Sequence, residues 1–248
     1  MKSYHDIKNF SDWSKTEKDQ YSIKVIKGLV MDATRKANSG HPGGPMSCAD
    51  FAYILYHDYL NFDPRNHEWF NRDRFVLSGG HMSMLQYSLL LLIGWLGMGD
   101  IKSFRQLHSR TPGHPEVEIP GVECTTGPLG QGFAMGVGMA HAEAYLHNLF
   151  RSLAEEAGQL VDHYTYVLAS DGDLQEPVTL GSASLAGHLG LSKLVVFYDA
   201  NEAQISGHTN RSDSTNYGIV FEGFNWHVQE INGHDHDQIR TAIEKAQG

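Results

Sequence analysis

The chain contains the run Tyr164-Thr-Tyr-Val-Leu-Ala-Ser-Asp171-Gly172-Asp173 and, further on, the run Leu194-Val-Val-Phe-Tyr-Asp-Ala-Asn201-Glu202-Ala203. Both runs begin with apolar residues rich in β-branched and aromatic types, which is typical of buried strands. Between them, helical spacing relates four residues: Leu180, Ser184, Leu185 and Leu189. This pattern predicts a strand–helix–strand unit, whose crossover lays the two strands parallel in one sheet.

Two polar side chains follow the predicted strands. Asp171 follows the first strand and Asn201 the second, so both emerge at the carboxyl edge of the sheet, where open α/β sheets bind ligands. One anionic and one neutral oxygen suit a hard divalent cation, most naturally Mg²⁺ holding a diphosphate. Gly172 would let the backbone approach the phosphate closely. A plainer interpretation is that these segments are only turns, which Asp-Gly and Asp-Ala-Asn form often.

Composition limits the class of protein. With 248 residues and 41% hydrophobic content, the chain can form one sizeable α/β core or at most two small ones. A net charge of −10 argues against non-specific nucleic-acid binding, and we expect a cytoplasmic protein. Cys48 and Cys124 lack metal-ligand spacing and are predicted to be buried free thiols. We find no signal-peptide pattern and no bilayer-spanning run, so no membrane partner is expected.

The rest of the chain alternates helix and strand patterns. Helices are predicted over 18–36, 47–60 and 235–246, and strands over 74–78 and 224–231. In the helix that follows Gly130, one face carries Gly132, Gly136 and Ala140, which would allow another element to pack very closely. The alternation predicts an α/β fold, a doubly wound parallel sheet with helices on both faces. We expect residues 17–248 to form this domain behind a polar arm of residues 1–16.

Three histidines lie in loops of the same kind. His41, His81 and His114 are each flanked by Gly or Pro, residues that fix the backbone and leave room for a ligand. A single histidine of this type is most simply a surface residue. Three of them beside a candidate cation and diphosphate site indicate one polar cleft, in which imidazoles donate to phosphate and hydroxyl oxygens and move protons near pH 7.

With these motifs in place, the chain resembles the N-terminal, thiamine-diphosphate-binding domain of transketolases. The similarity runs from about residue 15 to the C-terminus and rests on six specific runs: 36–46 (Lys-Ala-Asn-Ser-Gly-His-Pro-Gly-Gly-Pro-Met), 73–81, 104–116, 125–132, 161–166 and 231–235. The resemblance implies the thiamine-diphosphate-binding fold. It also implies transfer of a two-carbon ketol unit from a ketose phosphate to an aldose, with the cofactor carrying the carbanion chemistry.

The resemblance assigns the cofactor and its metal to particular residues. The cation, Mg²⁺ or Ca²⁺, would be ligated by Asp171, Asn201 and the backbone carbonyl of Ala203. The thiamine diphosphate would be held by Asp171 and Asn201 together with His81, the Gly127-Pro128-Leu129 turn and Gly172.

Catalytic roles follow from the same motifs. His41 and His114 would contact the hydroxyls of the ketose and assist proton transfer, beside His81. Glu176 matches a family glutamate that connects the two active sites of a dimer. Arg105 matches a family arginine, and an ordinary salt bridge is an equally good interpretation of it.

The chain departs from the family pattern in three ways. Ser170 and Pro177 stand where the family usually has Gly, and Glu202-Ala203 replaces the usual Gly-Ile. The chain also stops before a further strand, a pyrimidine-binding domain with the glutamate that activates the cofactor, and a C-terminal domain. We therefore expect a split subunit or a fragment, which needs a second chain or domain carrying that glutamate and forms a homo- or hetero-oligomer.

Two alternatives remain open. One is another thiamine-diphosphate enzyme: dihydroxyacetone synthase, deoxyxylulose-phosphate synthase or the alpha chain of a 2-oxo acid dehydrogenase. The run Thr111-Pro-Gly-His-Pro-Glu116 favours transketolase over the last two. The other is a non-catalytic, partner-binding paralogue, which the changes at Pro177 and Glu202 would support.

Overall fold

The computed structural model describes residues 10–153, 159–204 and 207–248. The described helices are α1 (Lys15–Ala37), α2 (Gly43–Ser47), α3 (Ala49–Ile54), α4 (Ser83–Leu92), α5 (Met98–Lys102), α6 (Gln131–Leu153), α7 (Asp171–Leu174), α8 (Pro177–Leu189), α9 (Tyr217–Gly223) and α10 (His236–Gln247). A π-helical turn (Leu55–Tyr59) and two 3₁₀ turns (Gly80–Met82, Thr209–Arg211) add to these. The strands are β1 (Arg74–Leu77), β2 (Thr165–Ser170), β3 (Leu194–Asp199), β4 (Ala203–Gln204) and β5 (Gly207–His208). None of the described helices is long and apolar enough to cross a bilayer.

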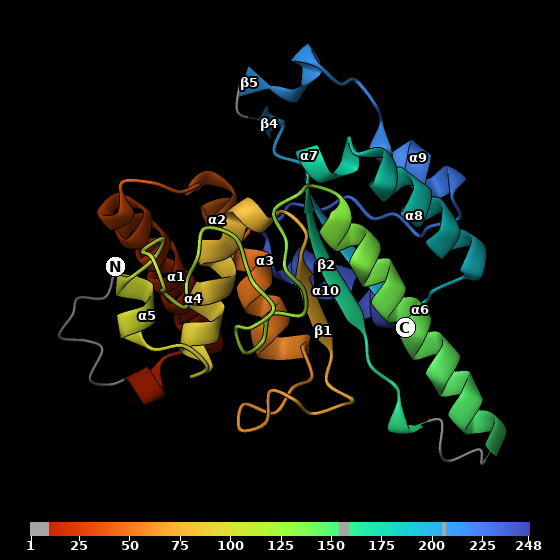
Figure 1. The fold of residues 1–248 in the computed structure, drawn as a ribbon, viewed down its shortest axis with the longest axis horizontal. Coiled ribbons are helices and arrows are strands. Elements are labelled where there is room, and N and C mark those ends of the chain that lie inside the picture. The colour runs from red at the N-terminus through yellow and green to blue at the C-terminus, as the bar shows by residue number, and fades with distance from the viewer. Residues whose placement is uncertain (1–9, 154–158, 205–206) are drawn as a thin grey trace.

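The main sheet is parallel, in the order β1-β2-β3. Successive side chains of a strand point to opposite faces, and the two cores follow this alternation. Tyr166 and Leu168 lie in the core formed with α1, α3, α4 and α10, whereas Val167 and Ala169 lie in the core formed with α6, α8 and α9. Figure 1 shows α6 and α8 on one side of β2 and α1, α3 and α4 on the other. The predicted α/β fold with helices on both faces is confirmed.

The strand–helix–strand unit predicted from the two apolar runs is also confirmed. β2 leads through α7 and α8 into β3, and the two strands pair in parallel from Thr165↔Leu194 to Ser170↔Asp199. Because the register is set in this way, both strands end at the same edge. The segments that begin at Asp171 and Ala200 therefore leave the sheet side by side.

Helix α1 begins with a capping box, in which the Ser14 hydroxyl accepts from the Glu17 N–H and the Glu17 carboxylate accepts from the Ser14 N–H. It ends at Asn38, which adopts the left-handed conformation with φ 49°. Ile26 and Val30 are completely buried on its inner face, and each contributes about 1.5–3 kcal/mol. The predicted helix over 18–36 is confirmed, and its end delivers the loop that carries His41.

Helix α6 packs directly on β2 through its glycines. A Cβ atom placed on Gly136 would lie only 2.4 Å from Cγ2 of Val167, and one placed on Gly132 would lie 2.6 Å from Cα of Ser78. Ala140, the third small residue of this face, is also buried. The very close packing predicted from these three positions is confirmed, and it sets the start of α6 over the end of β1.

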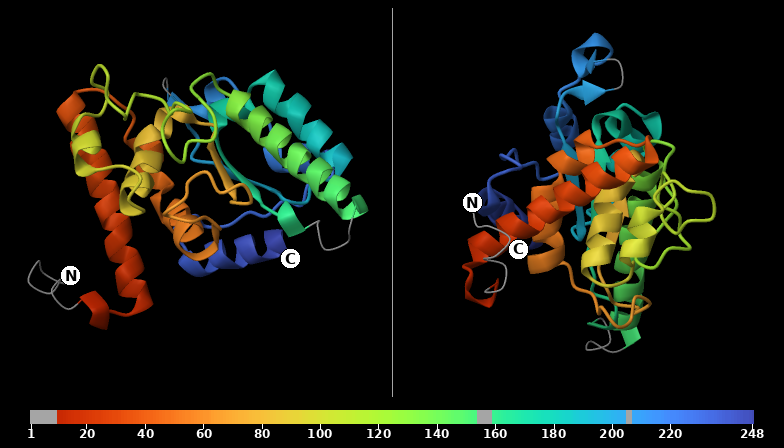
Figure 2. Two further views of the ribbon diagram at one scale, coloured as in Figure 1. Left: turned by 60° about the horizontal axis from the view of Figure 1, so that its bottom comes forward. Right: turned by 90° about the vertical axis from the view of Figure 1, so that its left-hand side faces the viewer.

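The predicted strand over 224–231 is wrong, whereas the helix predicted over 235–246 is confirmed as α10. The segment pairs with no strand because helices hold it. The Trp226 Nε1–H donates to the Ala183 carbonyl of α8, and the Gln229 amide donates to the Ala242 carbonyl of α10. Asp235 caps α10 by accepting from the N–H groups of Asp237 and Gln238. Figure 2 shows α10 on the opposite side of the sheet from α6 and α8.

The region predicted as one helix over 47–60 is divided. A short helix, α2, already begins at Gly43, and α3 starts at Ala49 with no side-chain cap. Ser47 does not act as the predicted cap, because its hydroxyl donates to Asp199 Oδ1 at 3.3 Å. This bond joins α2 to the end of β3, so the His41 loop is attached to the carboxyl edge of the sheet.

Candidate active site

Asp173 organises the carboxyl edge. It is fully buried, and its carboxylate accepts from the Ser78 hydroxyl at 2.6 Å, from the Gly130 N–H at 2.8 Å, and from both the N–H and the hydroxyl of Ser170 at 2.8 Å. Ser78 directly follows β1, Ser170 ends β2, and Gly130 closes the turn before α6. Four charge-assisted hydrogen bonds thus fix three separate segments around one carboxylate.

Asp171, two residues earlier, is left with a free oxygen. Its Oδ1 accepts from the Tyr198 hydroxyl, but Oδ2 is buried and has no hydrogen-bond partner among the described residues. Burial raises the pKa of the Asp171 carboxyl, and the nearby carboxylates of Asp199 and Glu202 add to this effect. A buried carboxylate oxygen without a donor costs free energy unless a cation or donor approaches it.

The other two predicted metal ligands lie beside Asp171. The Ala203 N–H donates to Asn201 Oδ1 at 2.9 Å, and the Ala203 backbone lies close enough to Asp171 to lower the pKa of its carboxyl. The Asn201 amide donates to Asp199 Oδ2 at 2.7 Å. The structure therefore brings Asp171, Asn201 and Ala203 into one cluster. Asp199, which the motif did not assign, orients Asn201.

A divalent cation fits this cluster. The donor set consists of carboxylate, amide and carbonyl oxygens, which Mg²⁺ and Ca²⁺ both prefer. The nearby carboxylates of Asp199 and Glu202 raise the pKa of the Asp171 carboxyl, and a bound cation would offset their repulsion. It would also supply the partner that Asp171 Oδ2 lacks.

Glu202 occupies a backbone conformation that favours glycine. Its φ is 56°, and its carbonyl accepts from the Thr209 N–H at 3.0 Å. A non-glycine residue in the left-handed region costs about 1–2 kcal/mol. The motif that the chain resembles carries Gly here, so the chain places a strained acidic residue beside the candidate cation site.

The predicted diphosphate cradle is compact. A Cβ atom placed on Gly172 would lie 2.8 Å from Cδ1 of Leu129, and one placed on Gly80 would lie 2.7 Å from the Gly127 nitrogen. The Gly127-Pro128-Leu129 turn therefore packs against both the start of α7 and the residue before His81. Gly127 has a φ of 143°, which a side chain rarely adopts.

The three loop histidines gather at this cradle. The rings of His41 and His81 meet edge to face with centroids 5.3 Å apart, and His114 Cγ lies 3.2 Å from a Cβ atom placed on Gly127. Burial lowers the pKa of all three imidazoles, and the Arg105 guanidinium lowers those of His41 and His114 further. Each ring is therefore neutral at pH 7 and offers one donor and one acceptor nitrogen.

Arg105 follows α5 and does not belong to it. The helix ends at Lys102, and Arg105 has a φ of 60°. The salt-bridge interpretation is not supported, because no ion pair joins Arg105 to a carboxylate in the described part of the chain. Its Nη1 instead donates to the Ser39 hydroxyl at 2.8 Å.

Glu176 lies at the start of α8. It is the N-cap residue of α8, is partly buried, and lies with its Cβ 2.8 Å from a Cβ atom placed on Gly130. Pro177, which stands in place of the family glycine, is the first residue of α8, a position that proline favours because its fixed φ suits a helix start. Proline at position 177 is therefore explained by the start of α8 and does not by itself support a non-catalytic paralogue.

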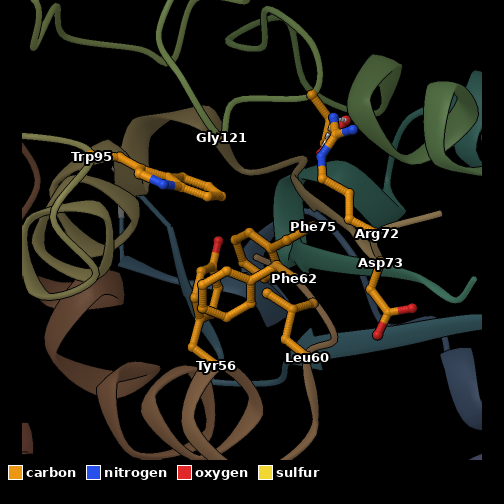
Figure 3. A pocket seen from close by; sticks show the side chains of 9 residues that line it. Tyr56, Leu60, Phe62, Arg72, Asp73, Phe75, Trp95 and Gly121 are labelled. Carbon is orange, nitrogen blue, oxygen red and sulfur yellow. Dashed lines mark hydrogen bonds and ion pairs between the residues drawn. The ribbon is translucent and has the colours of Figure 1, made fainter. Parts of the chain in front are cut away.

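A second hollow lies at the opposite edge of the sheet, where β1 begins. Figure 3 shows aromatic rings around it, from Tyr56, Phe62, Phe75 and Trp95. Arg72 closes one side, and its Nη2 donates to both carboxylate oxygens of Glu123, at 2.8 and 3.0 Å. The free volume of this hollow is about 10 Å³, room for one water molecule, so the hollow is too small to hold a substrate.

Four residues of the site were not predicted: Ser47, Asp173, Tyr198 and Asp199. One of them had a local signal, because Ser170 and Asp173 have the three-residue spacing of a capping box, which the structure contains. The bond between Ser47 and Asp199 joins positions far apart in the chain and has no local signal.

Comparison with known proteins now identifies the family. The profile described as "Transketolase, thiamine diphosphate binding domain" matches residues 18–248. A transketolase of Staphylococcus aureus is 51% identical over 232 residues, 93% of this chain and 35% of that protein. Transketolase from Campylobacter jejuni has a TM-score of 0.87 at 43% identity, covering 92% of this chain and 35% of that one. A Pichia stipitis transketolase, solved in complex with sedoheptulose-7-phosphate, has a TM-score of 0.87 at 42% identity, covering 92% and 34%.

The fold and the carboxyl-edge site define a diphosphate-binding α/β domain. The chain belongs to the transketolase family and corresponds to its N-terminal, thiamine-diphosphate-binding part. The resemblance read from the motifs is therefore confirmed. The chain spans about a third of the length of the relatives it matches.

Proposed function

We propose that this chain binds thiamine diphosphate and a divalent cation, and serves as the N-terminal part of a transketolase that transfers a two-carbon ketol unit from a ketose phosphate to an aldose. The observation that carries the proposal is the buried, unpartnered Oδ2 of Asp171, directly beside a glycine-lined cradle and three neutral histidines. The Pichia stipitis relative solved with sedoheptulose-7-phosphate supports ketose phosphates as the substrate class.

Asp171 is the central ligand of the proposed cation, Mg²⁺ or Ca²⁺. Asn201 and the carbonyl of Ala203 complete the protein's share of the coordination, and Asp199 holds the Asn201 amide in orientation. His81 and the backbone at Gly172 and at the Gly127-Pro128-Leu129 turn hold the diphosphate. The close contacts of Gly80 and Gly172 leave the backbone exposed to the phosphate oxygens without intervening side chains.

His41 and His114 act on the ketose. When bound, thiamine diphosphate supplies the thiazolium that stabilises carbanion chemistry. The histidines donate hydrogen bonds to the hydroxyl and carbonyl oxygens of the sugar and accept protons from its hydroxyl groups, which neutral rings allow. The hydrogen bonds around Asp173 keep the cradle in place while these protons move.

The remaining parts of the reaction belong to partners. We propose that a second chain or domain supplies the carboxylate for the pyrimidine ring of the cofactor, and that Glu176 communicates with the partner site across an oligomer interface. Residues 17–248 act as the diphosphate-binding domain behind the arm 1–16, and the protein works in the cytoplasm. Enclosure of the site by the partner would exclude water from the reacting centre.

The test is steady-state ketol transfer from sedoheptulose 7-phosphate to an aldose phosphate, with thiamine diphosphate and Mg²⁺ present. The chain is assayed alone and together with a polypeptide carrying the pyrimidine-binding and C-terminal domains of a transketolase. We expect turnover only in the mixture. Turnover by the chain alone, above a cofactor-only control, would contradict the need for a partner. An inactive mixture that still forms the complex and binds the cofactor would contradict the proposed reaction.

A further inference from the structure

Arg105 lies between two of the loops that form the site. Its Nη1 donates to the Ser39 hydroxyl at 2.8 Å, two residues before His41. On the other side, its guanidinium lies against Gly113, the residue before His114: a Cβ atom placed there would be 3.1 Å from both Cζ and Nε. One side chain therefore contacts the neighbours of two proposed substrate-binding histidines.

Both the backbone and the side chain of Arg105 are held by contacts with neighbouring residues. Its N–H donates to the Thr111 carbonyl at 2.9 Å, and its φ is 60°, a conformation that costs about 1–2 kcal/mol for a residue with a side chain. The guanidinium also lies over the Phe104 ring, with Cζ 5.6 Å from its centroid. Thr111 precedes the Pro112-Gly113-His114 segment, so Arg105 is joined to that loop by backbone as well as by side chain.

The guanidinium of Arg105 is not held by a carboxylate in the described part of the chain. No ion pair of Arg105 occurs within the described ranges, and its Nε is buried without a partner. A buried N–H without an acceptor costs about 1–3 kcal/mol. The chain thus retains both a strained backbone and an unpaired donor at Arg105, and neither is compensated by an ordinary salt bridge.

We propose that Arg105 is a positioning residue of the site: its planar guanidinium joins the loop that carries His41 to the loop that carries His114, and so fixes the separation of the two imidazoles that face the sugar. The proposal rests on the proposed function for the roles of the two histidines. A planar group is required because it must lie flat on Gly113 while donating in its plane to Ser39. An ammonium group would provide the charge without that geometry.

The charge of Arg105 has a second effect. Among the groups that lower the pKa values of the two histidines, Arg105 is the cation that acts on both, while His41 also lowers the pKa values of His81 and His114. Asp173 and Asp199 face His81 and oppose these effects there. Arg105 therefore favours neutral rings at His41 and His114, the form that both donates and accepts.

The experiment uses the 248-residue chain without cofactor, so that its result is independent of binding and turnover. The variants are Arg105→Gln, Arg105→Lys and the control Arg110→Gln, an arginine of the same loop whose guanidinium lies 3.5 Å from the Asp100 carboxylate. NMR reports two quantities: the cross-peak between the His114 ring Hδ2 and the Gly127 Hα, and the pKa values of His41 and His114. His41→Gln and His114→Gln assign the resonances.

We expect Arg105→Gln to lose the cross-peak and to raise both pKa values, while Arg110→Gln leaves both unchanged. Arg105→Lys should lose the cross-peak with the pKa values retained, which separates geometry from charge. If Arg105→Gln does not fold, the cross-peak of Arg105→Lys decides. An intact cross-peak in every folded Arg105 variant would overturn the proposal, as would the same loss in Arg110→Gln. Failure of cofactor binding by the parent chain would contradict the proposed function but not the positioning role.

Discussion

Asp171 and Asp173, separated by one glycine, differ in how their carboxylates are hydrogen-bonded. Asp173 accepts four hydrogen bonds and is structural, whereas Asp171 keeps one buried oxygen without a donor. The difference arises from their partners. Ser78 and Gly130, from other segments, supply hydrogen-bond donors to Asp173. The Asp171 oxygen has no such donor, so it is the carboxylate oxygen best suited to bind a cation.

Replacing Glu202 tests the strain beside this position. Glu202→Gly removes the left-handed penalty of about 1–2 kcal/mol but adds the chain entropy of glycine, so we expect a net stabilisation of about 0.5–1 kcal/mol in thermal unfolding of the metal-free chain. Glu202→Ala keeps the penalty and should gain nothing. Because both variants lose a negative charge near Asp171, both should bind Mg²⁺ more weakly than the parent. Equal stability of the Ala and Gly variants would contradict the account of strain.

The motifs predicted which residues gather here but not how each is held. The structure places His41, His81 and His114 together at the Gly127 turn, puts Asn201 and Ala203 beside Asp171, and sets Glu176 against Gly130. The roles of these residues remain predictions. Tyr198 and Asp199 were missed because a strand residue's partner across the sheet edge is set by register, which no local pattern encodes.

At the scale of elements, the contact between α6 and β2 sets the geometry of the carboxyl edge. Gly132 and Gly136 bring the helix backbone onto the strands, so that α6 begins directly over Ser78. The Ser78 hydroxyl accepts from the Phe133 N–H at 2.9 Å in the first turn of the helix. A displacement of α6 would therefore also disturb the hydrogen bond between Ser78 and Asp173.

Gly136→Ala should destabilise the chain by about 1–3 kcal/mol, because its Cβ would lie 2.4 Å from Cγ2 of Val167 and the helix must move. Gly138→Ala, in the same helix with nothing within 4 Å of its Cβ, should stabilise by about 0.5–1 kcal/mol through helix propensity. Urea unfolding of the two variants measures both. Destabilisation of similar size in both would show that the close approach on Val167 is not the cause.

The start of β2 makes the fold sensitive to acid. Burial lowers the pKa of His163 to about 4, and the positive charges of Arg74 and Lys193 contribute. Because the unfolded chain takes up this proton near the ordinary value of 6.5, His163 contributes stability that is fully present above pH 6.5 and is lost as the pH falls towards 4. The loss should be on the order of 2 kcal/mol.

Urea unfolding between pH 7.5 and pH 4.5 checks this expectation. His163→Gln should flatten the decline of unfolding free energy over that range, whereas His141→Gln, at an exposed position of α6, should leave it as in the parent. A His163→Gln variant with the same slope as the parent would mean that other groups carry the acid sensitivity.

Periodicity predicted the elements whose partners are close in sequence. The β2–α8–β3 unit and α1 were predicted because their apolar residues repeat at strand or helix spacing. The segment 224–231 has the same apolar character as a strand but is held by α8 through Trp226 and by α10 through Gln229. Whether an apolar run becomes a strand depends on which elements it packs against in the fold, and the pattern within the run does not encode those partners.

At the scale of the whole molecule, the residues proposed to bind the cofactor and substrate lie at the carboxyl edge of the sheet. The cation cluster, the glycine cradle and the loop histidines all lie there, while the opposite edge carries the small aromatic hollow of Figure 3. Parallel strands of one register produce this polarity, since every strand ends at the same edge. Because the chain spans about a third of its relatives, activity is proposed only for an assembly with the remaining domains.

The central claim is that Asp171 anchors a divalent cation that holds the cofactor, and calorimetry tests it most directly. Thiamine diphosphate is titrated into the parent chain and into Asp171→Ala, with Mg²⁺ and with chelator, and Asp63→Ala, at a partly exposed turn position, serves as the control. Loss of an outer-shell group typically costs 10–100-fold in metal affinity, so loss of this ligand should weaken metal-dependent binding by more than about 100-fold. We predict Mg²⁺-dependent binding by the parent and control, and none by Asp171→Ala at an unchanged unfolding midpoint. An Asp171→Ala variant that titrates like the parent would contradict the account.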